Sequence, residues 1–151
     1  MKIRFIFVGR KNNNTMPIVD EYIRKINYTC PAEILLLSPS GLGGDQARKI
    51  ESEKILSKLN TSDTVWLLDE TGESISSLQL ADMLASIRIT AKNITIVVGG
   101  AFGVSQQLKA RVDYRMSVSD MIFPHEIVWL MVTEQIYRGF EILKGSNYHH
   151  V

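Results

Sequence analysis

Two loops in the last third of the chain carry the residue types best suited to hold a ligand. The first contains Gly99, Gly100 and Gly103 and follows an apolar run that is typical of a β-strand. Glycine lets the backbone approach a flat or anionic group closely. The second loop, residues 117–125, is too apolar for an ordinary solvated connection. Its peptide groups need partners, so we expect both loops to close on one ligand.

The glycine spacing does not match the standard nucleotide-binding motifs. Gly99, Gly100 and Gly103 lack the spacing of the dinucleotide fingerprint, and no Lys-Ser or Lys-Thr pair follows them as in a P-loop. Neither a Rossmann dehydrogenase nor a P-loop enzyme is therefore supported. Residues 38–44 form another glycine-rich stretch, which we interpret as a mobile connection.

The elements that must position these loops alternate between short β-type runs and longer segments of helical periodicity. We predict strands at residues 2–8, 33–37, 64–68, 94–98 and 114–118, and helices at 17–27, 45–59, 76–87 and 126–143. The third and fourth strands are almost wholly apolar, as expected of central parallel strands covered on both faces. We predict a three-layer α/β sandwich with a mostly parallel sheet, which binds ligands at the carboxyl ends of its strands.

The apolar faces of two helices lead to more specific expectations. In the helix at 45–59, Ile50 and Ile55 are expected to face inward and Glu51 to face outward. The final helix, residues 126–143, is apolar nearly all round in its first half. Such a helix needs cover on more than one side, and a second copy of the chain would supply it. We predict a homodimer; the alternative is a core helix buried within one monomer.

The overall composition is that of one ordinary globular domain over residues 1–151. The chain has 45% hydrophobic residues and a formal net charge of +1. This charge argues against a strongly basic nucleic-acid binder, although residues 1–30 hold six basic and two acidic side chains. The single Cys30 excludes an internal disulfide, and no apolar run approaches the roughly 20 residues that span a bilayer. We expect a cytoplasmic protein.

Motifs along the whole chain, each weak alone, agree in order and spacing with one known family. They are the opening Lys2-Ile3 to Val8-Gly9, Leu68-Asp69-Glu70 with Gly72, Val98-Gly99-Gly100 with Gly103-Val104-Ser105, the run Ser117 to His125, Glu134-Gln135-Ile136-Tyr137-Arg138 with Phe140, and the closing Tyr148-His149. In these motifs the chain resembles the SPOUT-class methyltransferases of the ribosomal large subunit methyltransferase H type. Members of that family methylate N3 of a pseudouridine in 23S ribosomal RNA.

The resemblance implies both a chain path and a cofactor. It implies a C-terminal trefoil knot, an exception to the usual unthreaded connections. It also implies that S-adenosylmethionine binds in the knot. The residues assigned to the cofactor are Leu68, Gly99, Val118, Ser119, Asp120, Met121, Ile122 and Phe123. This assignment agrees with the two loops, since apolar side chains can sandwich an adenine while backbone groups read its edge.

The implied reaction requires a proton to leave the acceptor. N3 of a pseudouridine lies between two carbonyl groups and becomes a good nucleophile once its hydrogen is lost. A cation can stabilise the resulting anion. The resemblance places Arg138, Tyr148 and His149 at this step, with Arg138 as the anion stabiliser and His149 as a base or a phosphate contact. We interpret His125 as ordering its loop and Glu134 as a paired buried acid.

The resemblance also implies the partners. A homodimer that brings the basic N-terminal segment of one chain near the C-terminal tail of the other would form a composite cleft. Its substrate would be 23S rRNA within the assembled ribosome, where RNA and protein shape supply recognition. Neither a metal nor a membrane is implied.

Four positions depart from the family pattern. The family usually has a basic residue where this chain has Asp120 or His150, an arginine where it has Trp129, and an acidic or amide residue where it has Phe102. Three of these are losses of positive charge, from which we expect weaker RNA affinity or positioning. Two alternatives therefore stay open. One is a SPOUT-fold protein that binds S-adenosylmethionine or RNA with impaired catalysis, and the other is a flavodoxin-like α/β binding module.

Overall fold

The computed structural model describes residues 1–150, in which five parallel strands form one sheet. The strands are β1 (Ile3–Val8), β2 (Ala32–Leu37), β3 (Thr64–Ser74), β4 (Ile94–Val98) and β5 (Tyr114–Ser117), in the order β2-β1-β4-β3-β5. The helices are α1 (Met16–Asn27), α2 (Gly44–Leu56), α3 (Ser77–Thr90), α4 (Gln106–Arg111) and α5 (His125–Lys144). The predicted α/β class and parallel sheet are confirmed.

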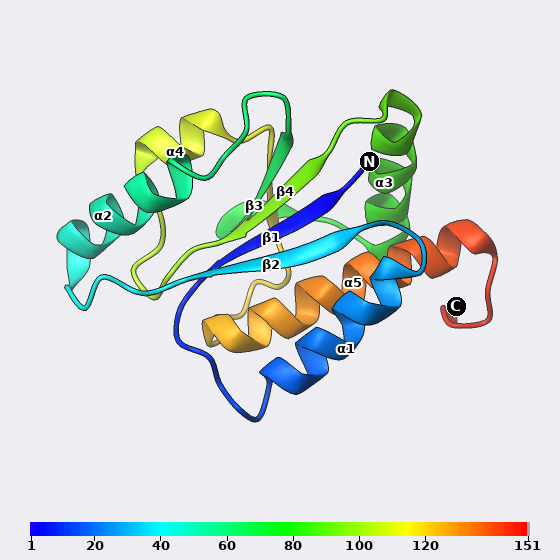
Figure 1. Cartoon of the computed structure of the whole chain (residues 1–151), viewed down its shortest axis with the longest axis horizontal. Helices are drawn as coiled ribbons and strands as arrows, with labels where there is room; N and C mark the ends of the chain where they lie inside the picture. The colour runs from blue at the N-terminus through cyan, green and yellow to red at the C-terminus, as the bar shows by residue number, and fades with distance from the viewer. Residues whose placement is uncertain (151) are drawn as a thin grey trace.

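Helices cover both faces of the sheet, so side chains that alternate along a strand enter two separate cores (Figure 1). Phe5 and Phe7 of β1 pack with residues of α1, α3 and α5, whereas Ile6 and Val8 pack with residues of α2 and α4. The two strands predicted to be central from their apolar sequences, β3 and β4, both lie inside the sheet and not at its edges. All five residues of β4 are buried between its neighbours β1 and β3.

The structure corrects the predicted packing of α2. Glu51 is only 4% exposed, whereas Ile50 is 37% exposed, the reverse of the expectation. The buried face follows the helical repeat through Ala47, Glu51 and Ile55. Burial of the Glu51 carboxylate is compensated on one side, because its Oε1 accepts hydrogen bonds from the backbone N–H and the hydroxyl of Ser40, at 2.8 and 3.0 Å.

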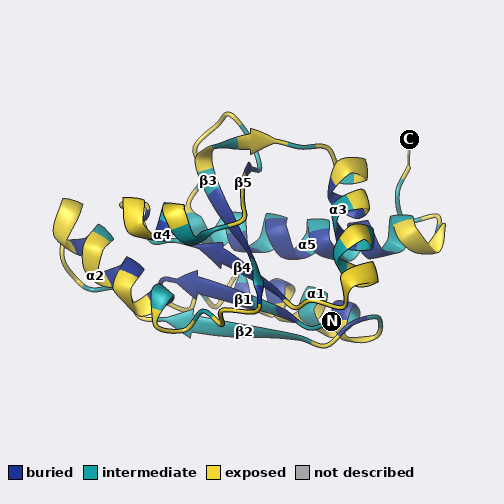
Figure 2. Ribbon diagram, turned by 90° about the horizontal axis from the view of Figure 1, so that it is seen from above, coloured by how far each residue is buried: buried dark blue, intermediate teal, exposed yellow. Residues whose placement is uncertain are grey.

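Two further elements differ from the sequence prediction. The short helix α4 was not predicted; it is capped by Ser105, whose hydroxyl accepts a hydrogen bond from the N–H of Leu108. Strand β3 continues past Leu68 and becomes exposed there (Figure 2). Leu68 and Glu73 both pair with Met116 of β5, so residues 69–72 form an excursion between two contacts with the same strand.

Gly72 allows this excursion to return against β5. A Cβ added there would lie 2.6 Å from the carbonyl carbon and 2.7 Å from the nitrogen of Met116. Backbone atoms inside a sheet cannot move aside as a flexible side chain can, so any larger residue would push the two strands apart.

Helix α5 buries one stripe against the sheet and leaves its other apolar side chains half covered. Trp129, Ile136 and Phe140 are buried, and Trp129 stacks on Phe7 with ring centroids 5.1 Å apart and an interplanar angle of 3°. Leu130 and Met131 are only partly buried. Within residues 1–150, no helix is long and apolar enough to cross a membrane.

Candidate functional site

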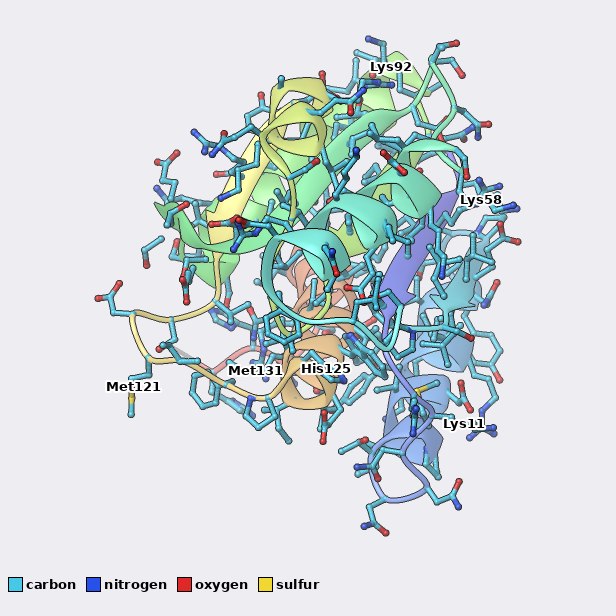
Figure 3. All side chains as sticks on the ribbon, turned by 90° about the vertical axis from the view of Figure 1, so that its left-hand side faces the viewer. Lys11, Lys58, Lys92, Met121, His125 and Met131 are labelled. Carbon is cyan, nitrogen blue, oxygen red and sulfur yellow. The ribbon has the colours of Figure 1, made fainter. Side chains whose placement is uncertain are left out.

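A pocket of about 1020 Å³ lies at the carboxyl ends of β3, β4 and β5, where ligands of parallel sheets usually bind. Its walls come from residues 68–71, 98–106, 117–119 and 121–125, together with Asp45, Arg48, Lys49, Lys109 and Val128. Figure 3 looks onto this end of the molecule, with Met121 standing out on one side, Lys11 on the other and His125 between them. The two loops that the sequence singled out therefore meet at one cavity.

The glycine loop is folded tightly enough that its residue types are restricted. The N–H of Gly103 donates to the carbonyl of Gly100 at 3.0 Å, and Gly103 has a φ of +74°, which favours glycine. A Cβ added to Gly99 would lie 2.6 Å from a methyl carbon of Val104. The backbone at Gly99 thus forms a bare wall of the pocket.

The second loop is ordered by its own serines. The Ser117 hydroxyl donates to the carbonyl of Ser119 at 2.7 Å, and the Ser119 hydroxyl accepts from the N–H of Met121 at 3.0 Å. Among the described residues, the N–H groups of Ile122 and Phe123 have no hydrogen-bond acceptor. These donors and the apolar side chains beside them are available to a ligand.

Seven of the eight residues assigned to the cofactor from the sequence line this pocket: Leu68, Gly99, Val118, Ser119, Met121, Ile122 and Phe123. The eighth, Asp120, is exposed and lies outside the pocket wall. Its side chain therefore does not enter the cavity in this structure.

An ion pair that was not predicted from the sequence closes one side of the pocket. The Lys109 ammonium lies 2.7 Å from the Asp69 carboxylate, whose side chain is only 9% exposed. Burial alone would raise the pKa of Asp69, but hydrogen bonds from Lys109 and Thr71 outweigh it and hold that pKa below its ordinary value. The only sign of this pair in the sequence was a lysine, Lys109, shortly after the glycine loop.

The predicted catalytic residues gather at the other end of α5. The Arg138 guanidinium donates to Glu134 Oε1, with Nε at 3.0 Å, and lies over the Tyr148 ring at 4.8 Å. Tyr148 also donates its hydroxyl hydrogen to Glu134 Oε1 at 3.1 Å, and His149 Nδ1 lies 3.5 Å from Arg138. Glu134 is thus a paired acid, as expected from the sequence.

The surroundings of this cluster hold two of its groups protonated. The hydrogen bond from Arg138 to Glu134 raises the pKa of Arg138. Burial, followed by hydrogen bonds with Tyr22 and Glu134, raises the pKa of Tyr148 well above that of a free phenol. Tyr148 is therefore a hydrogen-bond donor at neutral pH and no candidate base.

The cluster and the pocket are far apart within one chain. Arg138 lies 13 residues after His125 on one helix, a separation of about 20 Å at 1.5 Å per residue. The C-terminal end of α5 accordingly lies at the opposite end of the molecule from the pocket loops (Figure 1). Arg138, Tyr148 and His149 are thus brought together, but none of them lines the pocket of its own chain.

A family model described as predicted SPOUT methyltransferase matches residues 1–149. The chain belongs to the SPOUT methyltransferase family. Two relatives are named ribosomal RNA large subunit methyltransferase H. The one from Flavobacterium psychrophilum is 33% identical to this SPOUT protein, and the one from Acetivibrio thermocellus is 34% identical. In both comparisons the match covers 99% of each chain.

A solved structure supports the same fold. The tRNA (m1G37) methyltransferase of Aquifex aeolicus superposes with a TM-score of 0.56, over 91% of this SPOUT chain and 70% of that enzyme, at 18% identity. At this identity the likeness concerns the fold alone. The resemblance inferred from the sequence motifs is confirmed at the level of the family.

The structure shows where two residues that depart from the SPOUT family pattern, Trp129 and Phe102, lie. Trp129 is 0% exposed and belongs to the core, so its own side chain does not reach the surface, and the weaker RNA affinity expected from the missing arginine stays a prediction. The Trp129 ring packs directly against Gly9. A larger residue at position 9 would clash, because a Cβ there would lie 2.7 Å from both Trp129 and His125. Phe102 instead is 45% exposed at the rim of the pocket, where it can meet a ligand.

Proposed function

We propose that this chain is an S-adenosylmethionine-dependent methyltransferase that acts on N3 of a pseudouridine in 23S rRNA of the large ribosomal subunit. The observation that carries the proposal is the pocket closed by residues 99–103 and 117–123. Relatives that match over 99% of the chain are named ribosomal RNA large subunit methyltransferase H. We propose further that residues 1–151 act as one domain in the cytoplasm, where ribosomes are found.

The pocket suits S-adenosylmethionine in both size and chemistry. Leu68, Val118 and Phe123 offer apolar surface for an adenine ring. The free N–H groups of Ile122 and Phe123 can donate to ring nitrogens, and the bare backbone at Gly99 permits close approach. We assign Asp120 a place on the loop through its backbone alone, because its side chain is exposed.

The reaction needs an activated methyl donor and an acceptor nitrogen, N3 of the pseudouridine, that has lost its proton. When bound, S-adenosylmethionine supplies a sulfonium methyl group, whose S–C bond breaks toward sulfur as the N3–C bond forms. The chain must align the acceptor and accept the N3 proton. We assign Arg138 to stabilise the imide anion and His149 to take the proton or contact a phosphate. Tyr148 holds Glu134, which in turn orients Arg138.

A second copy of the chain would bring these groups to the pocket. One chain separates them by about 20 Å of helix, while the half-covered apolar side of α5 includes Leu130 and Met131. A homodimer that buries this side with its α5 helices antiparallel would place the Arg138 cluster of each chain near His125 of the other. We propose that the active site is composite in this way.

We also infer a trefoil knot in the C-terminal half. The excursion of residues 69–72 around Met116, with Gly72 against the backbone of β5, supports a threaded path. A knot would let one short segment contact cofactor from several sides without a separate lid.

The decisive experiment is methyl transfer to ribosomes from a strain that lacks this modification, followed by mass mapping of the 23S rRNA. We expect one added methyl group on a pseudouridine. N3 of that nucleotide should then resist chemical alkylation. Calorimetric titration with S-adenosylmethionine supplies the binding test. No binding at millimolar ligand would overturn the methyltransferase proposal, and binding without transfer would support the impaired alternative.

A further inference from the structure

A second cavity of about 560 Å³ adjoins the first across the glycine loop. The two cavities share Gly100, Ala101, Phe102 and His125 in their walls. The other walls of the second cavity come from residues 8–12, which follow β1, from Pro39, Gly41 and Leu42, and from the carboxylates Glu51 and Glu126. A molecule in the second cavity would therefore lie next to a ligand in the first.

The rim of the second cavity combines two free cations with an apolar platform. Arg10 and Lys11 are exposed, and neither forms an ion pair or a side-chain hydrogen bond with any residue in the described range 1–150. Phe102 presents an exposed ring, while its backbone is held by a hydrogen bond from Arg48 Nε to its carbonyl at 3.0 Å. Cations beside a fixed aromatic ring suit a phosphate and a stacked base.

The inner wall of this cavity holds a carboxylate oxygen without a partner. Glu51 lines the cavity and is 96% buried, since only 4% of it is exposed. Its Oε1 is used by Ser40, but Oε2 has no hydrogen-bond partner among the described residues. Oε2 lies directly beneath Gly100, where any added Cβ would clash with it. The oxygen is enclosed by the protein beneath Gly100, so an N–H or O–H of a ligand can satisfy it once the backbone at Gly100 moves aside.

We propose that the second cavity, here called the acceptor cavity, holds the target nucleotide, an inference that rests on the proposed function. Its base stacks on Phe102, and its flanking phosphates contact Arg10 and Lys11. Glu51 Oε2 accepts the N1–H of the pseudouridine. Uridine has no such hydrogen, because its N1 is bonded to the ribose. Glu51 is thus a specificity residue that distinguishes pseudouridine from uridine, and the methylated N3 faces the first pocket.

The Glu51→Gln variant tests this contact with little disturbance. Glutamine keeps an acceptor oxygen for Ser40 and replaces the unpartnered acceptor by an NH₂ donor, so the loop at residue 40 retains its hydrogen bond. We expect S-adenosylmethionine affinity within two-fold of wild type, by calorimetry. Transfer to ribosomes carrying the unmethylated pseudouridine should fall by about ten-fold or more in kcat/KM, and the preference over ribosomes carrying uridine should disappear.

Two further variants test the platform and the phosphate contacts. Phe102→Ala should lower kcat/KM by about 5- to 150-fold, the range of one base–aromatic stack. The double variant Arg10→Gln, Lys11→Gln should weaken ribosome binding and flatten its dependence on salt. Ile89→Ala and Lys92→Gln, both at exposed positions remote from the cavity walls, serve as matched controls and should behave as wild type. Thermal unfolding checks that each variant is folded.

The outcomes separate this inference from the proposed function. If wild-type protein transfers methyl groups and the folded acceptor-cavity variants do so equally well, the acceptor cavity is wrong and the proposed function stands. If wild-type protein transfers none to either kind of ribosome, both are overturned. Loss of S-adenosylmethionine affinity in Glu51→Gln would also count against the inference, because it would assign Glu51 to the cofactor pocket.

Discussion

Lys109 on α4 lies 2.7 Å from Asp69, which follows Leu68 in the middle of β3, and this ion pair joins the two sides of the first pocket. Asp69 also accepts hydrogen bonds from the backbone and hydroxyl groups of Thr71. The pair therefore fixes the start of the excursion at residues 69–72, which forms part of the pocket wall. A mostly buried carboxylate that loses its cation keeps the cost of burial without the compensating attraction.

Replacing Lys109 by methionine should weaken S-adenosylmethionine binding. We expect the dissociation constant to rise by about ten-fold, equivalent to about 1.4 kcal/mol, because the loop loses its anchor. Calorimetry measures this change, with Lys92→Met as the control at an exposed lysine that has no ion pair within residues 1–150. An unchanged dissociation constant in Lys109→Met would show that the pair is not needed to shape the pocket.

The Asp69 carboxylate should contribute to the pH dependence of stability. Its pKa in the folded state is lowered, since hydrogen bonds from Lys109 and Thr71 outweigh the effect of burial. The unfolded value is about 3.9, so the contribution is fully present above that pH and is lost as pH falls through the lower folded value. Urea unfolding between pH 2.5 and pH 7 tests this. In Lys109→Met the folded pKa should rise, so the contribution should shrink and its loss should be complete at a higher pH.

Alanine at Gly72 should strongly destabilise the fold. The added Cβ would lie 2.6 Å from the backbone of Met116, and we expect the free energy of unfolding to fall by about 3 kcal/mol or more. Gly43→Ala is a matched control, because the nearest atom to a Cβ there is 3.9 Å away and its φ is −119°. Equal stabilities of the two variants in urea would contradict the tight approach of residue 72 to β5.

Arginine at Trp129, the residue usual in the family, should unfold this chain and should not improve RNA binding. The side chain at this position is buried and stacked on Phe7, so the substitution removes a large apolar contact and buries a charge. We expect a loss of about 4 kcal/mol or more in the free energy of unfolding. Circular dichroism with urea measures it, and a stably folded variant with tighter ribosome binding would refute this assignment of Trp129 to the core.

Mixed dimers should recover activity if the active site is composite. We suggest combining Arg138→Ala with Ser119→Trp, a change designed to fill the cofactor pocket, after calorimetry has verified that the second variant no longer binds S-adenosylmethionine. Each variant alone should be inactive. Statistical mixing at equal amounts should restore about a quarter of wild-type transfer, because half of the dimers then hold one intact site of two. A mixture no more active than its parents would place the whole site within one chain.

Local patterns were sufficient for most of the elements and for the pocket loops. Strand β4 was predicted at its observed bounds because five β-branched residues, four of them apolar, followed by glycines have few other solutions. Helix α4 was missed because six residues carry too little periodicity to be distinguished from a loop. The reversed faces of Ile50 and Glu51 show the limit of such patterns, since the partner that permits a buried carboxylate is the Ser40 backbone, which hydropathy cannot register.

By itself the sequence determined the α/β class, the loops that form the pocket and the family, because these depend on local periodicity and on the order of motifs. Tertiary structure alone decided that Trp129 is a core residue, that Lys109 faces Asp69 and that Arg138 lies a helix length from the pocket of its own chain. Each of these depends on which residues distant in sequence become neighbours. Such proximity is set by the packing of the whole sheet and its helices, and no single segment of the chain encodes it.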